Sequence, residues 1–83
     1  MRVKLLLFAT LRDRAGKKSI EIEIPEDANV RTLKDRVGQD YPGLNQSMET
    51  VLVSINHEFA FDDALVPENA EIALFPPVSG GKL

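Results

Sequence analysis

Two strongly apolar stretches lie at opposite ends of this chain, and their pairing constrains the fold more than any other feature. The first spans residues 2–9, and the last spans residues 71–75, which run directly into Pro76. Alternate residues of the first stretch give two apolar faces, one with Val3, Leu5 and Leu7 and the other with Leu6 and Phe8. Strands that are apolar on both faces are typical of the middle of a sheet. We therefore expect these two strands to be central in one mixed sheet and parallel to each other.

The residues that follow the first strand predict a hairpin and then a helix. Residues 14–18 are typical of a polar turn, with Gly16 available for positive φ. The next strand alternates strictly, with Ile20, Ile22 and Ile24 on its apolar face, and it ends at Pro25. Asn29 can cap a helix whose apolar face is Val30, Leu33 and Val37 and which ends near Gly38 and Pro42.

Three short strands complete the pattern. We expect irregular structure over residues 43–49 and then a strand over 51–55. A turn at 56–58, with a solvated His57, should lead into a short strand over 59–61. We expect Leu65 to anchor the loop before the last strand. A mixed sheet of four or five strands crossed by one main helix satisfies burial best. The sequence therefore predicts an α+β fold of the β-grasp, or ubiquitin-like, type over residues 1–75.

Composition and charge exclude several classes of function. With 83 residues, the chain has no room for a self-contained catalytic cleft, and its formal charge of −3 makes nucleic-acid binding a poor hypothesis. It contains no cysteine, which excludes disulfides and thiolate chemistry, and no motif indicates a bound metal or cofactor. No apolar run reaches the roughly 20 residues of a membrane helix, so we expect a cytoplasmic protein that does not bind membranes.

Charge is distributed unevenly along the chain. Residues 37–81 contain seven acidic residues and neither lysine nor arginine. Such a segment favours a partner with a basic docking surface, because complementary charge accelerates and orients encounter. The same pattern is also explained by solubility alone.

The last eight residues have the composition of a tail that is presented to another protein. Pro76 and Pro77 favour a stiff, extended path, whereas Gly80 and Gly81 have no side chains to obstruct passage through a narrow channel. We therefore expect residues 76–83 to form a flexible tail outside the folded domain. Lys82 and Leu83 follow Gly81, so chemistry at a Gly81 carboxylate requires their removal first.

Two segments of the chain resemble the small subunit of molybdopterin synthase, a sulfur carrier of the MoaD/ThiS family. They are residues 7–12, with the sequence LFATLR, and residues 71–81, with the sequence EIALFPPVSGG. The resemblance covers nearly the whole chain. Carriers of the thiamine pathway are similar in fold and also end in diglycine, but they are usually shorter and lack the Phe-Pro-Pro-Val stretch.

The resemblance implies a noncatalytic carrier that holds sulfur as a thiocarboxylate on Gly81. A separate E1-like enzyme uses ATP to adenylate this carboxylate, so the chain itself binds no cofactor and no metal. The thiocarboxylate then enters the large synthase subunit and donates sulfur for the dithiolene of molybdopterin. The resemblance further implies a heterotetramer of two small and two large subunits.

The resemblance also assigns roles to particular residues. Gly81 is the residue that is activated, with Gly80 beside it, and the positions that contact the large subunit are Phe8, Arg12, Phe59, Phe75, Pro76, Pro77 and Val78. The residues alone leave two places open for Phe8 and Phe75, the core between sheet and helix or the exposed sheet face. Their phase opposite Leu7 and Leu74 favours the exposed face.

Two departures from the family pattern affect these expectations. Asn69 and Ala70 replace the usual Gly-Asp before the last strand, and Asn69 can still adopt a left-handed conformation. Lys82 and Leu83 are a cloning remnant, an extension that a protease removes, or the sign of a chain that never carries sulfur. The alternatives to a molybdopterin carrier are a thiamine-type carrier, a ubiquitin-like modifier joined to lysines through Gly81, and an inert β-grasp binding module.

Overall fold

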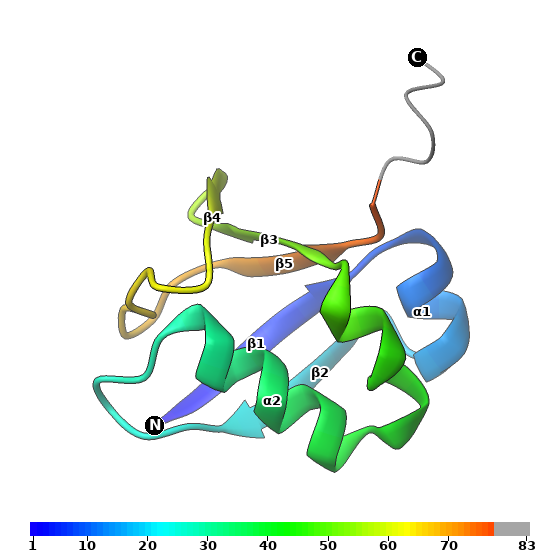
Figure 1. The fold of residues 1–83 in the computed structure, drawn as a ribbon, viewed down its shortest axis with the longest axis horizontal. Coiled ribbons are helices and arrows are strands. Elements are labelled where there is room, and N and C mark those ends of the chain that lie inside the picture. The colour runs from blue at the N-terminus through cyan, green and yellow to red at the C-terminus, as the bar shows by residue number, and fades with distance from the viewer. Residues whose placement is uncertain (78–83) are drawn as a thin grey trace.

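One mixed five-stranded sheet organises the molecule. The structure is a computed structural model, and it describes residues 1–77. The elements in chain order are β1 (Arg2–Leu7), α1 (Ala9–Ala15), β2 (Ser19–Glu23), α2 (Val30–Asp40), the short 3₁₀ helices η1 (Pro42–Leu44) and η2 (Gln46–Glu49), β3 (Leu52–Ile55), β4 (Glu58–Ala60) and β5 (Ile72–Phe75). Figure 1 shows α2 crossing one face of the sheet.

The strand order is β2-β1-β5-β3-β4, with β1 and β5 parallel and the other neighbours antiparallel. The expected pairing of the first and last strands is therefore confirmed, as is the α+β class of β-grasp type. The register places Leu5 opposite Ile72 and Leu7 opposite Leu74. These four side chains are buried, which is the physical reason that two strands so distant in sequence pair at the centre of the sheet.

A single apolar core fills the space between the sheet and α2. The buried residues that the sheet and α2 contribute are Val3, Leu5, Leu7, Ile20, Ile22, Val30, Leu33, Val37, Val53, Ile72 and Leu74. The expected apolar face of the helix is confirmed, and so is its cap. The Asn29 Oδ1 atom accepts a hydrogen bond of 2.9 Å from the Thr32 backbone N–H, which satisfies one of the free donors at the helix start.

The prediction of a polar hairpin turn after the first strand is wrong. The strand ends at Leu7, and residues 9–15 form helix α1, which buries Leu11. Ala9 has φ of 52°, and this left-handed residue turns the chain from β1 into α1. Gly16 does have positive φ, 69°, but it ends α1 as a left-handed cap rather than forming a hairpin turn.

Two expectations in the second half of the chain also need correction. Residues 43–49 are not irregular, because η1 and η2 bury Leu44 and Met48 against the core. Leu65 does not anchor the loop before the last strand, since its side chain is 67% exposed. The neighbouring Val66 is buried instead, and its backbone N–H donates to the Ala28 carbonyl at 3.0 Å.

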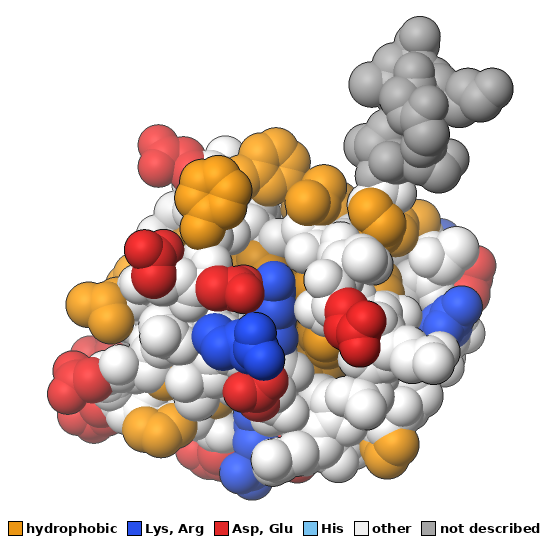
Figure 2. All heavy atoms as spheres, in the orientation of Figure 1, with side chains coloured by type: hydrophobic (Ala, Val, Ile, Leu, Met, Phe, Trp, Pro, Cys, Tyr) orange, Lys and Arg blue, Asp and Glu red, His pale blue; other side chains and the backbone are white. Residues whose placement is uncertain are grey.

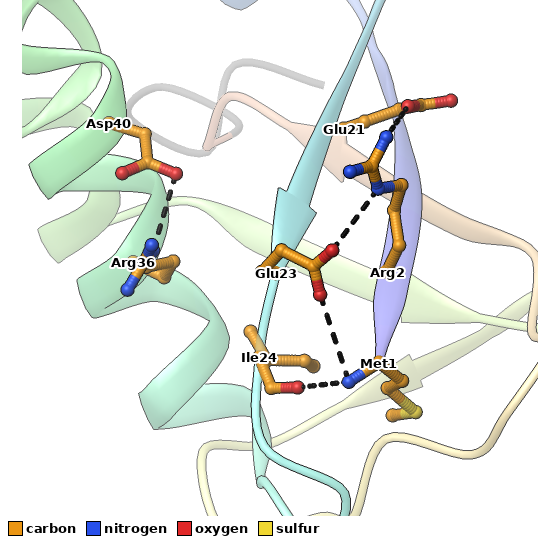
Figure 3. A network of polar contacts seen from close by, with 7 residues as sticks. All are labelled: Met1, Arg2, Glu21, Glu23, Ile24, Arg36 and Asp40. Carbon is orange, nitrogen blue, oxygen red and sulfur yellow. Dashed lines mark hydrogen bonds and ion pairs between the residues drawn. The ribbon is translucent and has the colours of Figure 1, made fainter.

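An ion-pair network joins the edge strand β2 to its neighbour β1. The Arg2 guanidinium lies 3.2 Å from a Glu23 carboxylate oxygen and 3.4 Å from one of Glu21, while the Met1 amino group donates to the Ile24 carbonyl (Figure 3). The helix α2 carries a separate pair, Arg36 with Asp40, at 3.3 Å. The first two pairs join residues on opposite strands, so they favour the observed register of β1 and β2.

No helix within residues 1–77 has the length and hydropathy needed to cross a membrane. Pro76 and Pro77 follow β5, whereas the remaining residues of the expected tail, 78–83, lie outside the described residues. The division into a domain over 1–75 and a tail over 76–83 stays a prediction.

Candidate functional site: an aromatic surface beside the start of the tail

Three phenylalanines from distant parts of the chain share the sheet face opposite α2. Residues alternate along β5, so Leu74 points into the core and Phe75 points away from it. Leu52 lies opposite Phe75, and Phe59 follows the same face from β4, opposite Ser54. Phe8 continues the line of β1, because its backbone N–H donates to the Leu74 carbonyl at 3.3 Å.

The three rings touch. Phe8 stacks on Phe75 with ring centroids 4.7 Å apart and an angle of 10° between the rings, and Phe59 meets Phe75 edge to face at 6.4 Å and 72°. Phe75 is half-buried between them, whereas Phe8 is 39% exposed, Leu52 is 38% exposed and Phe59 is 71% exposed. We call these four residues, Phe8, Leu52, Phe59 and Phe75, the phenylalanine surface.

The structure decides between the two places left open for Phe8 and Phe75. Neither residue belongs to the buried core, where the preceding residues Leu7 and Leu74 take the inward positions. Contiguous exposed apolar groups are typical of interaction sites. The docking role itself stays a prediction, but three of the residues expected to have it, Phe8, Phe59 and Phe75, lie together on one face.

Arg12 lies on α1, four residues after Phe8. Its backbone carbonyl accepts the hydrogen bond that caps the helix, from Gly16 N–H at 2.9 Å, and its side chain is exposed. Within residues 1–77 the Arg12 guanidinium has no acidic partner within 4.0 Å. Its guanidinium is therefore available for a contact with another molecule.

The tail begins at the edge of this surface. Pro76 and Pro77 form one wall of a polar hollow of about 270 Å³, which Thr10 and Arg14 of α1 and Ser47 of η2 also line. Pro76 is half-buried and Pro77 is exposed. Val78, Gly80 and Gly81, which are also predicted site residues, lie outside the described residues. Pro76 and Pro77 thus leave the fold next to Phe75, after a strand that is paired with β1 on one side and β3 on the other.

One acidic residue of the second half of the chain, Asp62, forms ion pairs with helix α2. Asp62 receives a 2.7 Å hydrogen bond from Lys34 Nζ of α2, and Arg31 lies 3.9 Å away. The hydrogen bond from Lys34 holds the pKa of the Asp62 carboxyl below its ordinary value of 3.8. The described residues contain no group of three or more acidic or histidine side chains placed to hold a metal ion.

Sequence reasoning did not single out Leu52 and Phe61. Leu52 is on the phenylalanine surface, and Phe61 is 81% exposed just beyond β4. A signal for both exists, since Leu52 alternates with the buried Val51 and Val53, and Phe61 is two residues from Phe59. His57 is exposed in the expected turn, with Nε2 3.3 Å from a Glu71 carboxylate oxygen.

Comparison with known proteins places these features in a family. The sequence matches the ThiS family over residues 5–81. This chain belongs to the ThiS family. The match includes every residue of the phenylalanine surface and both Gly80 and Gly81.

Relatives of the chain are known by sequence and by structure. The molybdopterin synthase sulfur carrier subunit of Dictyostelium discoideum is 37% identical over 81 residues, with 94% of each chain covered. The subunit of the same name from Arabidopsis thaliana is 30% identical over 81 residues, covering 98% of this chain and 84% of the relative. The crystal structure of SAMP1 from Haloferax volcanii superposes on this chain with a TM-score of 0.83 at 29% sequence identity. The superposition covers 98% of this chain and 100% of SAMP1.

Proposed function

We propose that this chain is the sulfur-carrier subunit of a molybdopterin synthase. The observation that carries the proposal is the name that the two sequence relatives share, since the chain aligns with them over almost its full length. The phenylalanine surface and the diglycine motif give that function a physical basis, because a carrier needs a surface for docking and an unhindered end for its cargo. No residue of the folded part is required to perform catalysis.

The cargo would be held on the main chain. Once the bond between Gly81 and Lys82 is cleaved, the Gly81 carboxylate attacks the α-phosphate of ATP on an E1-like partner, and pyrophosphate leaves. The terminal sulfur of a persulfide on a donor protein then attacks the acyl carbon, and AMP leaves, which gives an acyl disulfide. A second thiol of the donor cleaves the sulfur–sulfur bond, so that the thiocarboxylate leaves and the two donor thiols become a disulfide. This route needs no thiol in the carrier, in agreement with a chain that lacks cysteine. It places ATP in the partner and leaves the carrier without a bound cofactor.

The large synthase subunit is the partner that we infer for the phenylalanine surface. Phe75 ends a central strand, and Gly81 follows it by six residues, 75 to 81, so the tail can extend about 20 Å from the surface. The site that receives sulfur must therefore lie within that distance of the partner residues that contact Phe75. Two carriers and two large subunits would form the complete synthase.

The deciding experiment is the intact mass of the protein purified from its native host, with and without a thiol-alkylating reagent. We expect a chain that ends at Gly81 and gains one alkyl group, because a polypeptide without cysteine offers the reagent no other thiol. The reagent is needed because oxidation of Met1 or Met48 nearly equals the mass change from oxygen to sulfur. A native chain that is never alkylated would contradict the proposal.

Two variants test the mechanism further. Deletion of Gly81 should abolish sulfur transfer and leave the unfolding temperature unchanged, because the core lies within residues 3–74. Replacing Gly80 with valine should block transfer in the same way if the tail threads a narrow channel. A protein named small archaeal modifier protein 1 shares this fold, so the fold does not distinguish a sulfur carrier from a protein modifier. Covalent adducts with host proteins that depend on Gly81 would indicate the modifier function.

A further inference from the structure

A second apolar feature lies beside the phenylalanine surface, at the free edge of the sheet. A groove of about 670 Å³ runs between the edge strand β4 and α2. The buried Val51 and Val53 lie at its base, while Leu52, Phe59 and Phe61 are its exposed apolar walls. Figure 2 shows hydrophobic side chains gathered over β4 and β3, with acidic side chains directly beside them. Leu52 and Phe59 belong to both features, so the two surfaces are continuous.

The wall that contains Phe61 is held in place by the helix behind it. The Phe61 carbonyl accepts a hydrogen bond from Ala64 N–H at 3.0 Å, and the Asp62 carbonyl accepts one from Arg31 N–H at 3.0 Å. The Lys34 side chain fixes the Asp62 carboxylate as well. The Phe61 side chain is 81% exposed, but these hydrogen bonds already order its backbone. A partner that binds there therefore loses less conformational entropy.

Two aspartates line the groove, and within residues 1–77 only one of them is paired with a cation. Asp62 is compensated by Lys34 and Arg31, but Asp63, which also lines the groove, has no cation within 4.0 Å among residues 1–77. Residues 37–77 supply no lysine or arginine that could approach it. A molecule that fills the groove thus meets apolar walls and one uncompensated carboxylate.

We propose that this groove receives a segment of the large synthase subunit in which an apolar side chain packs between Phe59 and Phe61 and a neighbouring lysine or arginine pairs with Asp63. The inference rests on the proposed function, because it assigns the groove to the same partner as the phenylalanine surface. Two observations select this occupant. The groove is continuous with the phenylalanine surface. The unpaired Asp63 carboxylate favours a basic group on the partner.

Binding of the full-length carrier to the large subunit from the same organism tests the proposal. Isothermal titration calorimetry of Phe61→Ser should give a dissociation constant about tenfold above that of the wild type, as for an apolar anchor lost from an interface. Asp63→Asn should raise the constant about threefold and reduce its dependence on salt, because a partly exposed ion pair is screened. Thermal unfolding checks that both variants remain folded.

A different hollow of the same molecule supplies a matched control. Asp27 lines it and is exposed, whereas Leu65, which lines it too, also borders a hollow with Phe59, Phe61 and Asp63 and is therefore unsuitable. Asp27→Asn should bind within about twofold of the wild type. Wild-type affinity in Phe61→Ser, unchanged salt dependence in Asp63→Asn, or an equal loss in Asp27→Asn would each overturn the groove assignment while leaving the proposed function intact.

Two further outcomes are distinct. If the wild-type chain does not bind the large subunit at all, the proposed function fails, and the groove assignment fails with it. If sedimentation shows a wild-type dimer that Phe61→Ser dissociates, the occupant is a second copy of this chain, and the assignment to the large subunit is overturned.

Discussion

At the scale of single residues, Asn29 decides where the main helix begins. Its Oδ1 atom accepts hydrogen bonds from both the backbone N–H and the hydroxyl of Thr32, at 2.9 Å and 3.1 Å. Asn29→Ala should lower the free energy of unfolding by about 1 kcal/mol, because a helix donor is left without its partner. Urea denaturation measures the change. Asn29→Asp keeps the acceptor and should restore most of the loss, so a matching loss in that variant would refute the capping role.

Asp62 gives stability that depends on pH. Lys34 holds the Asp62 pKa below its ordinary value, so the folded state favours the charged carboxylate. The contribution is fully present above the unfolded-state pKa of about 4 and disappears as pH falls through the lower folded-state pKa. We expect the wild type to be more stable than Asp62→Asn at pH 7 and the two to converge in acid. The difference should be small, since the side chain is 49% exposed.

Denaturant unfolding of both proteins across the acidic range measures this convergence. Asp63→Asn is the matched control, because that neighbouring carboxylate has no cationic partner within residues 1–77. A gap between the wild type and Asp62→Asn that stays constant into strong acid would show that the Lys34 contact adds no stability through charge.

At the scale of elements, the turn between β3 and β4 has two residues with positive φ. Asn56 and His57 have φ of 53° and 72°, which is typical of a type I′ hairpin turn. Asparagine and histidine are among the non-glycine residues found most often in this region, but both carry a Cβ, whose steric cost glycine avoids. His57→Gly should therefore be more stable than His57→Ala by about 1 kcal/mol, although both lack the imidazole. Thermal unfolding of the two variants compares them, and equal stabilities would rule out backbone strain as the cause.

Helix α1 is an element that the sequence pattern did not predict. Only Leu11 of its seven residues is buried, so no helical period is visible in the sequence. The turn into the helix depends on positive φ at Ala9, a conformation that alanine rarely adopts and that composition does not signal. The strands and α2 were predictable because each repeats its apolar residues with the correct period. The buried residue of the loop before β5 was predicted as Leu65, whereas it is Val66. Leu65 and Val66 are adjacent and both apolar, so the sequence pattern does not indicate which of them is buried.

At the scale of the whole molecule, the sheet brings together groups that are distant in sequence. Alternation along β1 and β5 favoured the face opposite the helix for Phe8 and Phe75, and the structure confirms it. It could not show that Phe8 and Phe75 stack at 4.7 Å, because that distance depends on the parallel register of the two strands. The groove beside Phe61 was not predictable for a similar reason, since it depends on how the loop after β4 packs on α2.

This arrangement predicts that stability and binding separate within the phenylalanine surface. Phe59 is 71% exposed and meets its neighbour only by an edge, so Phe59→Ala should change the free energy of unfolding by less than about 0.5 kcal/mol. The same change should weaken binding to the large subunit about tenfold, because the ring becomes buried only in the complex. Phe75→Ala should weaken binding and also lower stability by about 1–3 kcal/mol, since it removes the half-buried ring that contacts both others.

Urea denaturation and calorimetric titration on the same preparations measure the two effects independently. Asp27→Asn is again a suitable control, because Asp27 is exposed and lines a hollow that includes no residue of the surface. If Phe59→Ala destabilises the fold as much as Phe75→Ala, the aromatic cluster serves to stabilise the fold, and its exposure does not indicate a docking site. If both variants bind the large subunit as tightly as the wild type, the partner must contact a different face, and the limit of about 20 Å on the position of the sulfur-accepting site would no longer apply.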